Sequence, residues 1–205
     1  MSETLNLNPV IESEYRTAVT NVVIMYPDVR TTGGFRMTTD EIKSTLEGNF
    51  HSAVQRLLKR YKRNGAQITG IVYQDTSPDN FSPLFPREGF DSLVSVPVNF
   101  ADWHRVDHSD LLESIYKKLG ISGNTVVGGY HAFDCVAKMI QVLENKGHKV
   151  KPNLLLTNEL GELLVAHKVR SILGAGYSET DRRNDIDNWN CKYQEFNRIV
   201  CGLEK

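Results

Sequence analysis

Short runs of apolar residues alternate along the chain with longer stretches whose apolar positions recur every three or four residues. The short runs predict buried strands at residues 22–25, 68–73, 93–98, 126–129 and 148–156. The longer stretches predict helices at residues 49–63, 109–119, 133–145 and 159–173. Strands that alternate with helices in this way form parallel βαβ units. The pattern therefore predicts an α/β fold, a doubly wound three-layer sandwich with a mostly parallel central sheet.

The ends of the chain differ from this pattern and predict two appendages. Residues 1–19 form a polar N-terminal arm, residues 20–173 the α/β domain, and residues 174–205 a helical extension that follows Gly174-Ala-Gly176. The extension carries an apolar stripe at helical spacing, made by Ile186, Trp189, Tyr193, Phe196 and Val200. Such a stripe either covers the domain's own core or docks on another subunit or a protein partner. Both interpretations stay open, and the second predicts a homo-oligomer or a protein partner held through the extension.

Composition excludes some classes of function. The 205 residues are 40% hydrophobic and carry a formal net charge of −1, without the basic excess of a dedicated nucleic-acid or membrane-surface binder. No apolar run is long enough to span a bilayer, and the N-terminus lacks the pattern of a signal peptide. Three cysteines at unrelated spacings do not indicate a disulfide framework. We therefore predict a cytoplasmic protein, in the host cytoplasm if the chain is viral.

Cys135 is the candidate nucleophile, because the run 124–136 predicts a buried strand that leads directly into a helix. A thiol on the first turn of a helix lies beside unpaired backbone N–H groups and the positive end of the dipole, which lower a cysteine pKa. The alternative is that Cys135 is a small residue buried in the core, as free cysteines usually are.

Several polar residues follow the ends of predicted strands and so converge on one edge of the sheet. In doubly wound sheets this edge, beyond the carboxyl ends of the strands, holds the ligand crevice. Asp28 and His131 lie there as candidate catalytic partners of Cys135. We predict that a pocket for a small molecule is lined by Met25, Asp75, Asn99, Tyr130 and Asp134. Asp28 equally suits a turn after Pro27, and Asp134 equally suits helix capping.

Four short motifs lie in an order that resembles the isochorismatase-like superfamily of cysteine hydrolases, which includes nicotinamidases. They are Met25-Tyr-Pro-Asp28 with Gly33-Gly34 in register, Gln74-Asp75 after the second strand, Gly129-Tyr-His-Ala-Phe-Asp-Cys135-Val136, and Gly147-His-Lys-Val150. The resemblance covers roughly residues 20–170. It implies an isochorismatase-like fold and a site in which an aspartate and a lysine activate the cysteine for attack on a carbonyl.

The departures from that family pattern bear on function more than the matches do. The position of the aspartate is occupied by Met25, and the position of the lysine by Val96. Ser77 and Asn80 stand where the nicotinamidases have metal-binding histidines, and Asp75 alone is a poor metal site. We therefore expect neither a metal nor a cofactor, and the chain leans away from being an enzyme.

Three functions remain as hypotheses. The first is a non-catalytic isochorismatase-like protein that serves as a binding or assembly module. The second is a cysteine hydrolase for a small amide or related carbonyl compound, with His131 or Asp28 as the substitute base for Cys135. The third, less favoured, is a nucleic-acid-associated protein that uses the basic helix at residues 56–63.

Overall fold

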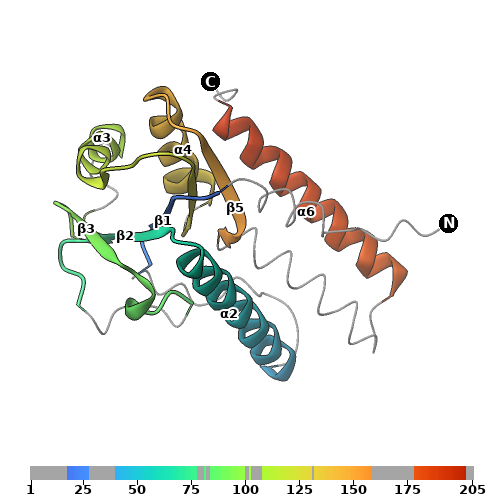
Figure 1. The fold of residues 1–205 in the computed structure, drawn as a ribbon. Coiled ribbons are helices and arrows are strands. Elements are labelled where there is room, and N and C mark those ends of the chain that lie inside the picture. Colours follow the sequence, from blue (N-terminus) through green and yellow to red (C-terminus); the bar gives the residue numbers. More distant parts are fainter. Residues whose placement is uncertain are drawn as a thin grey trace.

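A sheet of five parallel strands in the order β3-β2-β1-β4-β5 forms the centre of the molecule (Figure 1). Its strands are β1 (Asn21–Met25), β2 (Gln67–Tyr73), β3 (Ser92–Val96), β4 (Thr125–Gly129) and β5 (Val150–Thr157). The computed structural model describes residues 18–27, 40–77, 81, 84–99, 102, 108–130, 132–157 and 178–201. Within these residues every predicted strand is present and all pairings are parallel, so the predicted α/β fold class is confirmed.

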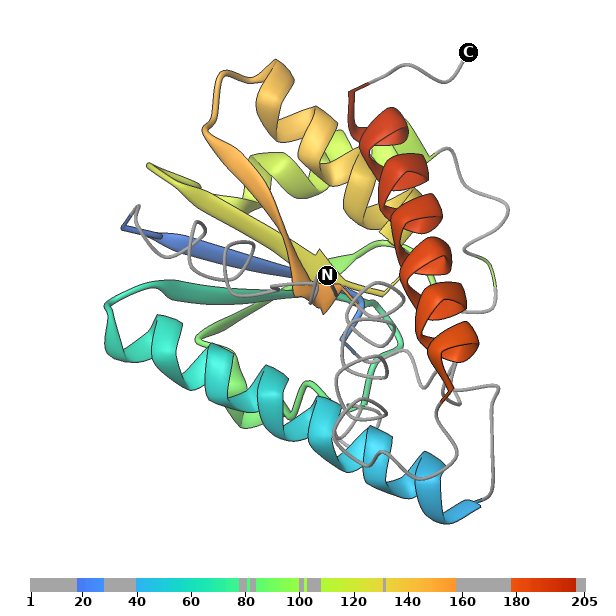
Figure 2. The ribbon, with the colours of Figure 1, turned by 90° about the vertical axis from the view of Figure 1, so that its right-hand side faces the viewer.

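Helices cover both faces of the sheet, which gives the three predicted layers (Figure 2). Helix α2 (Asp40–Arg63) lies on one face, and α3 (His108–Leu119) and α4 (Ala137–Asn145) lie on the other. Helix α6 (Glu179–Val200) packs against α4, and two short helical turns, η2 (Arg87–Gly89) and η4 (Ala132–Val136), precede β3 and α4. The predicted helix at 159–173 and most of the predicted arm at 1–19 lie outside the described residues.

Helix α2 is longer than its apolar pattern predicted, since it begins at Asp40 rather than at residue 49. The apolar positions that predicted it do face the core, because Val54, Leu57, Leu58 and Tyr61 are all buried. The pattern located the packed half of the helix. It could not locate the start, because helix ends depend on caps and local hydrogen bonds more than on periodicity.

Strand β5 lies at the edge of the sheet and contains a large bulge. Val127 of β4 pairs with Pro152, whereas Gly129 pairs with Thr157, so residues 127 to 129 of β4 run beside residues 152 to 157 of β5. Asn153 holds the bulge: its side-chain oxygen accepts from the N–H groups of Leu155 and Leu156, at 3.0 and 3.1 Å. A proline is tolerated here because an edge strand need not donate every N–H to a neighbour.

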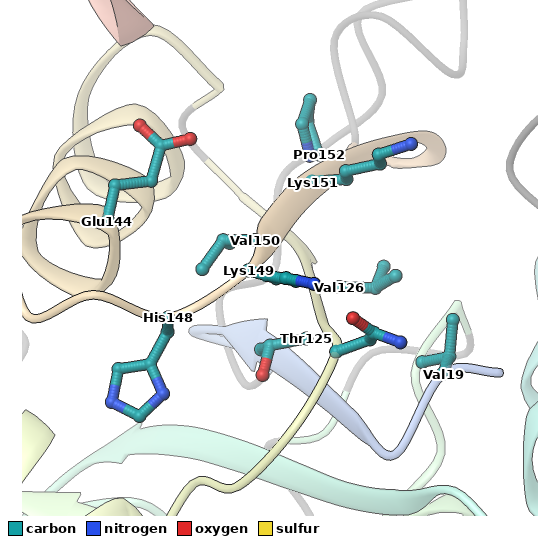
Figure 3. Close-up of a pocket in the computed structure, with 10 residues that line it drawn as sticks. Val19, Thr125, Val126, Glu144, His148, Lys149, Val150, Lys151 and Pro152 are labelled. Atoms are coloured by element: carbon teal, nitrogen blue, oxygen red, sulfur yellow. The ribbon is translucent and has the colours of Figure 1, made fainter. Parts of the chain in front are cut away.

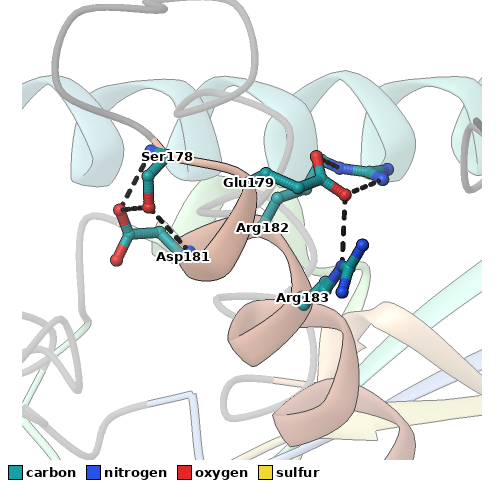
Figure 4. Close-up of polar contacts among 5 residues, drawn as sticks. All are labelled: Ser178, Glu179, Asp181, Arg182 and Arg183. Atoms are coloured by element: carbon teal, nitrogen blue, oxygen red, sulfur yellow. Dashed lines mark hydrogen bonds and ion pairs between the residues drawn. The ribbon is translucent and has the colours of Figure 1, made fainter.

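Helix α6 begins with a capping box (Figure 4). The Ser178 hydroxyl accepts from the N–H of Asp181 at 3.1 Å, and the Asp181 carboxylate accepts from the N–H of Ser178 at 3.0 Å. In the same turn, the Glu179 carboxylate pairs with Arg182 and Arg183. These hydrogen bonds lower the pKa of Glu179 to about 2, with Arg182 as the main cause. The first turn is therefore fixed by local contacts.

The apolar stripe of α6 packs on the chain's own core, which favours one of the two interpretations of the extension. Trp189 is buried and stacks on Tyr193, and Phe196 is fully buried with its ring edge-on to Phe133 of η4, at 6.2 Å between centroids. The side-chain amide of Gln141, on α4, donates to the carbonyl of Ile199. The extension is thus an integral layer of the domain in the described structure.

Candidate functional site

The topology places the site where β1 and β4 lie side by side. The chain moves outward from β1 to β2 and β3, then returns to the other side of β1 with β4 and β5. In doubly wound sheets, a reversal of strand order like this one marks the usual place of the ligand site, at the carboxyl ends of the two adjacent strands. Met25, the last residue of β1, pairs with Gly129, the last residue of β4. The segments that follow them, at Tyr26 and Tyr130, therefore form the walls of the candidate site.

The backbones of β1 and β4 approach too closely at this point for any side chain on Gly129. Its φ is 121°, in a region that other residues rarely adopt, and a Cβ atom there would lie 2.2 Å from the carbonyl oxygen of Met25. The N–H of Tyr130 donates to that same oxygen at 3.0 Å. Tyr26 also has a positive φ, of 52°, which is unusual for a residue with a side chain. The carboxyl ends of β1 and β4 are thus tightly fitted to each other, and the backbone at Tyr26 is strained.

Cys135 lies on the turn that joins β4 to α4, but its surroundings differ from a regular helix start. It belongs to η4, a π-helical turn that leads into α4, and only 2% of its surface is exposed. Fully packed residues of the same region, including Met25, Ala132 and Val136, belong to the same apolar cluster. The thiol is therefore a buried core group in this structure.

The surroundings of Cys135 raise its pKa to about 12. Burial is the largest cause, because it penalises the charged thiolate, and the negative charge of Asp134 adds to it. The thiol donates a long hydrogen bond to Asp134 Oδ2, at 3.8 Å, which also favours the protonated form. Lys138 pairs with Asp134 at 2.5 Å and opposes this shift only in part. The lowered pKa expected from a helix start is wrong here, since burial of the thiol raises its pKa.

Apolar, buried residues occupy the two positions at which the superfamily that the sequence resembles has an activating aspartate and lysine. Met25 and Val96 are each 0% exposed. A thioether cannot accept the thiol proton, and a valine cannot stabilise a thiolate by charge. Both side chains pack in the core instead of presenting a functional group to Cys135.

Aromatic side chains fill the carboxyl end of the sheet beside these positions. Tyr26 stacks on Tyr73, at 4.4 Å between ring centroids, and Phe85 meets Tyr130 edge-on at 5.9 Å. All four are at most 3% exposed. Tyr130, predicted to line a pocket, is thus part of a packed aromatic layer together with the end of β1.

Two of the other predicted site residues, Asp75 and Asn99, lie away from Cys135. Asp75 and Asn99 follow β2 and β3, on the side of β1 away from β4 and Cys135. Asn99 accepts a hydrogen bond from the Gln74 side chain at 2.8 Å, so it links two loops at that edge. Asp28 and His131, the candidate bases, lie outside the described residues and stay predictions. Of the predicted set, a backbone hydrogen bond joins Tyr130 to Met25, and a side-chain hydrogen bond joins Cys135 to Asp134.

Sequence reasoning missed Lys138 as the ion-pair partner of Asp134, and it wrongly considered Asp134 as a helix cap. Asp134 does not cap α4, whose N-cap position falls at Val136 without a side-chain cap. It forms an ion pair with Lys138 instead, four residues further along. The i,i+4 spacing of opposite charges was a usable signal for this pair. Within the described residues, no cluster of histidine, cysteine, aspartate or glutamate could hold a metal ion.

Comparison with known proteins adds little to this geometry. No protein-family model matches the chain, and neither does any curated protein. One solved structure that it resembles is the YcaC gene product of Escherichia coli, described as an octameric hydrolase of unknown specificity. That match covers 91% of this chain and 92% of that chain, with 15% sequence identity and a TM-score of 0.34. Similarity at this level carries no argument about function. Separately, none of the helices in the described ranges is long and apolar enough to cross a membrane.

Proposed function

We propose that this chain is a non-catalytic member of the isochorismatase-like superfamily that serves as a binding or assembly module. The observation that carries the proposal is the state of Cys135, a buried thiol whose pKa is raised to about 12. At neutral pH a thiol with that pKa is ionised to about one part in 10⁵. Because the thiolate is the nucleophile, so small a fraction leaves little capacity for attack on a carbonyl.

The alternative is a cysteine hydrolase for a small amide or related carbonyl compound. One observation favours it: Asp134 and Lys138 place a carboxylate and an ammonium group near Cys135, so the three residue types of the family's active site are present on one helical segment. The combined effect of the two charges disfavours a thiolate, since Asp134 raises the pKa of the Cys135 thiol more than Lys138 lowers it. His131 or Asp28 would have to supply the base in this alternative.

Mass spectrometry after alkylation separates the two proposals. The folded protein is treated with iodoacetamide at pH 7.5, and modification is followed at each of its cysteines. Cys191 and Cys201 are exposed and free, so they serve as internal controls in the same sample. We expect Cys135 to react at least about 100-fold more slowly than either, because it is buried and protonated. Modification of Cys135 as fast as the two controls would favour the hydrolase.

The assembly part of the proposal concerns the outward face of α6. The apolar stripe is occupied by the domain core, so a partner would contact the polar side, which carries Glu179, Arg183, Asn190 and Gln194. We expect light scattering on the full chain to give a molar mass of at least two subunits. A monomeric mass at every concentration up to about 100 μM, in the range where weak interfaces associate, would remove self-assembly from the proposal.

We also propose the cytoplasm as the location of the protein. The chain has three cysteines, and Cys135, Cys191 and Cys201 are all free. Free, exposed cysteines suit a reducing compartment better than an oxidising one.

A further inference from the structure

A cavity lies at the amino ends of β4 and β5, whereas Cys135 follows the carboxyl end of β4. Its volume is about 360 Å³, within the usual size range of ligand pockets. Figure 3 shows the side chains around it, which come from the segment before β1, the start of β4, the end of α4 and the start of β5. Residues distant in sequence, such as Val19, Thr125 and Lys151, meet there because the strand ends are adjacent.

Two lysines give the cavity a positive side. Lys149 directly precedes β5 and Lys151 is its second residue, and Figure 3 shows both side chains extending to the same side. Both are exposed, and no ion pair joins either of them to a carboxylate within the described residues. Glu144, on α4, is the acidic residue of the lining, so the formal charge of the lining is +1 with histidine neutral, from two lysines and one glutamate.

The rest of the lining combines apolar walls with three polar residues, Asn124, Thr125 and His148. Val19, Val126, Val150 and Pro152 supply the apolar surface. His148 is held in place by Tyr116, whose hydroxyl lies 3.2 Å from its Nε2 atom. A positive rim on an apolar cavity suits a molecule with an anionic head and an apolar body.

Thr125, at the start of β4, lies in the wall of the cavity but is itself enclosed by protein. The residue is 2% exposed, and within the described structure its buried hydroxyl oxygen has no hydrogen-bond partner. Its backbone N–H is satisfied, since it donates to the carbonyl of Lys149 at 2.9 Å. A buried hydroxyl without a partner is unfavourable, so this wall of the cavity is not optimised for stability alone.

We propose that this cavity binds a small organic anion, a phosphate or carboxylate attached to an apolar body. Lys149 and Lys151 bind the anionic head, because charge-assisted hydrogen bonds to ammonium groups are the strong ones. The apolar body packs against Val126, Val150 and Pro152. The cavity shares no residue with the Cys135 site, so this proposal stands whether or not that site is catalytic.

The test uses phenyl phosphate and benzoate as anionic probes and benzyl alcohol as the neutral probe of similar shape. Binding to the full chain is followed by NMR titration. We expect saturable binding of at least one anion, with shifts at residues 124–126 and 148–152. Whichever anion binds more tightly identifies the headgroup. Absence of saturable binding by both anions, or equal affinity for benzyl alcohol, would overturn the proposal.

Matched variants test the two lysines. The double variant Lys149→Gln/Lys151→Gln should weaken binding of the anion by about 10-fold or more. The control Lys59→Gln/Lys117→Gln changes the net charge equally at exposed positions on α2 and α3, and should leave affinity within about 2-fold. Equal weakening in both variants would assign the effect to overall charge and contradict the proposal. Cys135→Ser should leave binding unchanged, which keeps this result separate from the test of Cys135.

Discussion

Replacement of Gly129 by alanine is expected to cost at least about 4 kcal/mol of stability, a large share of the roughly 5–15 kcal/mol by which ordinary domains are stable. The new Cβ atom would lie 2.2 Å from the Met25 carbonyl oxygen and 2.4 Å from the Met25 nitrogen. Both are backbone atoms of the neighbouring strand, so no side-chain rotation can relieve the clash. The φ of 121° adds backbone strain for any residue with a side chain. Urea denaturation followed by circular dichroism measures the loss.

Gly120→Ala is the control for this prediction. Gly120 also has a positive φ, of 57°, but nothing lies within 4 Å of a Cβ atom placed there. Alanine at position 120 should therefore cost only the conformational penalty, about 1–2 kcal/mol. If the two variants lose the same stability, β1 and β4 do not approach as described, and the location of the candidate site is wrong.

Phe196→Ala is expected to destabilise the protein by about 3–5 kcal/mol, the usual cost of removing a buried aromatic ring. Phe196 is fully buried, although it lies on a helix that follows the predicted domain, and its ring contacts Phe133 just before Cys135. Thermal and urea denaturation of the variant measure the loss. The surface variant Gln194→Ala, on the exposed side of the same helix, should change stability by less than about 0.5 kcal/mol.

A small effect of Phe196→Ala, below about 1 kcal/mol, would mean that α6 does not belong to the core in solution. The stripe of α6 would then be free for a partner, which is the interpretation that the structure disfavours. Deletion of residues 174–205 is a less informative experiment, because it removes both Trp189 and Phe196 from the core and destabilises whatever remains.

The sheet could be predicted well from the sequence because its central strands, β1, β2 and β4, are buried on both faces. Runs such as Val22-Val-Ile-Met25 and Val126–Gly129 are continuous stretches of apolar or small residues, the pattern that helices on both sides of a parallel sheet require. Their order along the chain, with helices between them, determines the parallel pairing. The position of Cys135 at the carboxyl end of β4 followed from the same pattern.

The bulge in β5 could not be predicted, because it depends on contacts between distant segments. Asn153 bonds the N–H groups of Leu155 and Leu156 while its amide donates to the hydroxyl of Tyr61 on α2, at 2.9 Å. Gly128 is needed opposite the bulge, since a Cβ atom there would lie 2.5 Å from Leu156. Periodicity in the local sequence contains no information about such long-range fits.

The chemistry of the site was partly predictable. The sequence has Met25 and Val96 at the positions where the superfamily that it resembles has an aspartate and a lysine, and the structure buries both side chains. The direction of the Cys135 pKa shift was not visible, because the helix position and the degree of burial have opposite effects. The cavity near Thr125 and Lys149 was also hidden, since its lining is assembled from segments around residues 19, 125 and 150.

The raised pKa of Cys135 also predicts a dependence of stability on pH. A cysteine whose pKa is higher in the folded state than in the unfolded chain contributes stability that is fully present below the unfolded value of about 8.5. That contribution is lost as the pH rises toward the folded value of about 12. The direction of this change follows from burial of the thiol in the folded state only.

The measurement that tests the central claim most directly is a titration of the Cys135 thiol itself. The variant Cys191→Ser/Cys201→Ser, labelled with ¹³C at the cysteine Cβ, leaves one signal whose chemical shift reports ionisation between pH 6 and pH 11. We expect that signal to show no midpoint below about pH 10 in the folded protein, as a pKa of about 12 requires. The urea-unfolded variant should titrate near pH 8.5. A midpoint below 8.5 in the folded protein would mean that Cys135 is an activated nucleophile, and the non-catalytic account would be wrong.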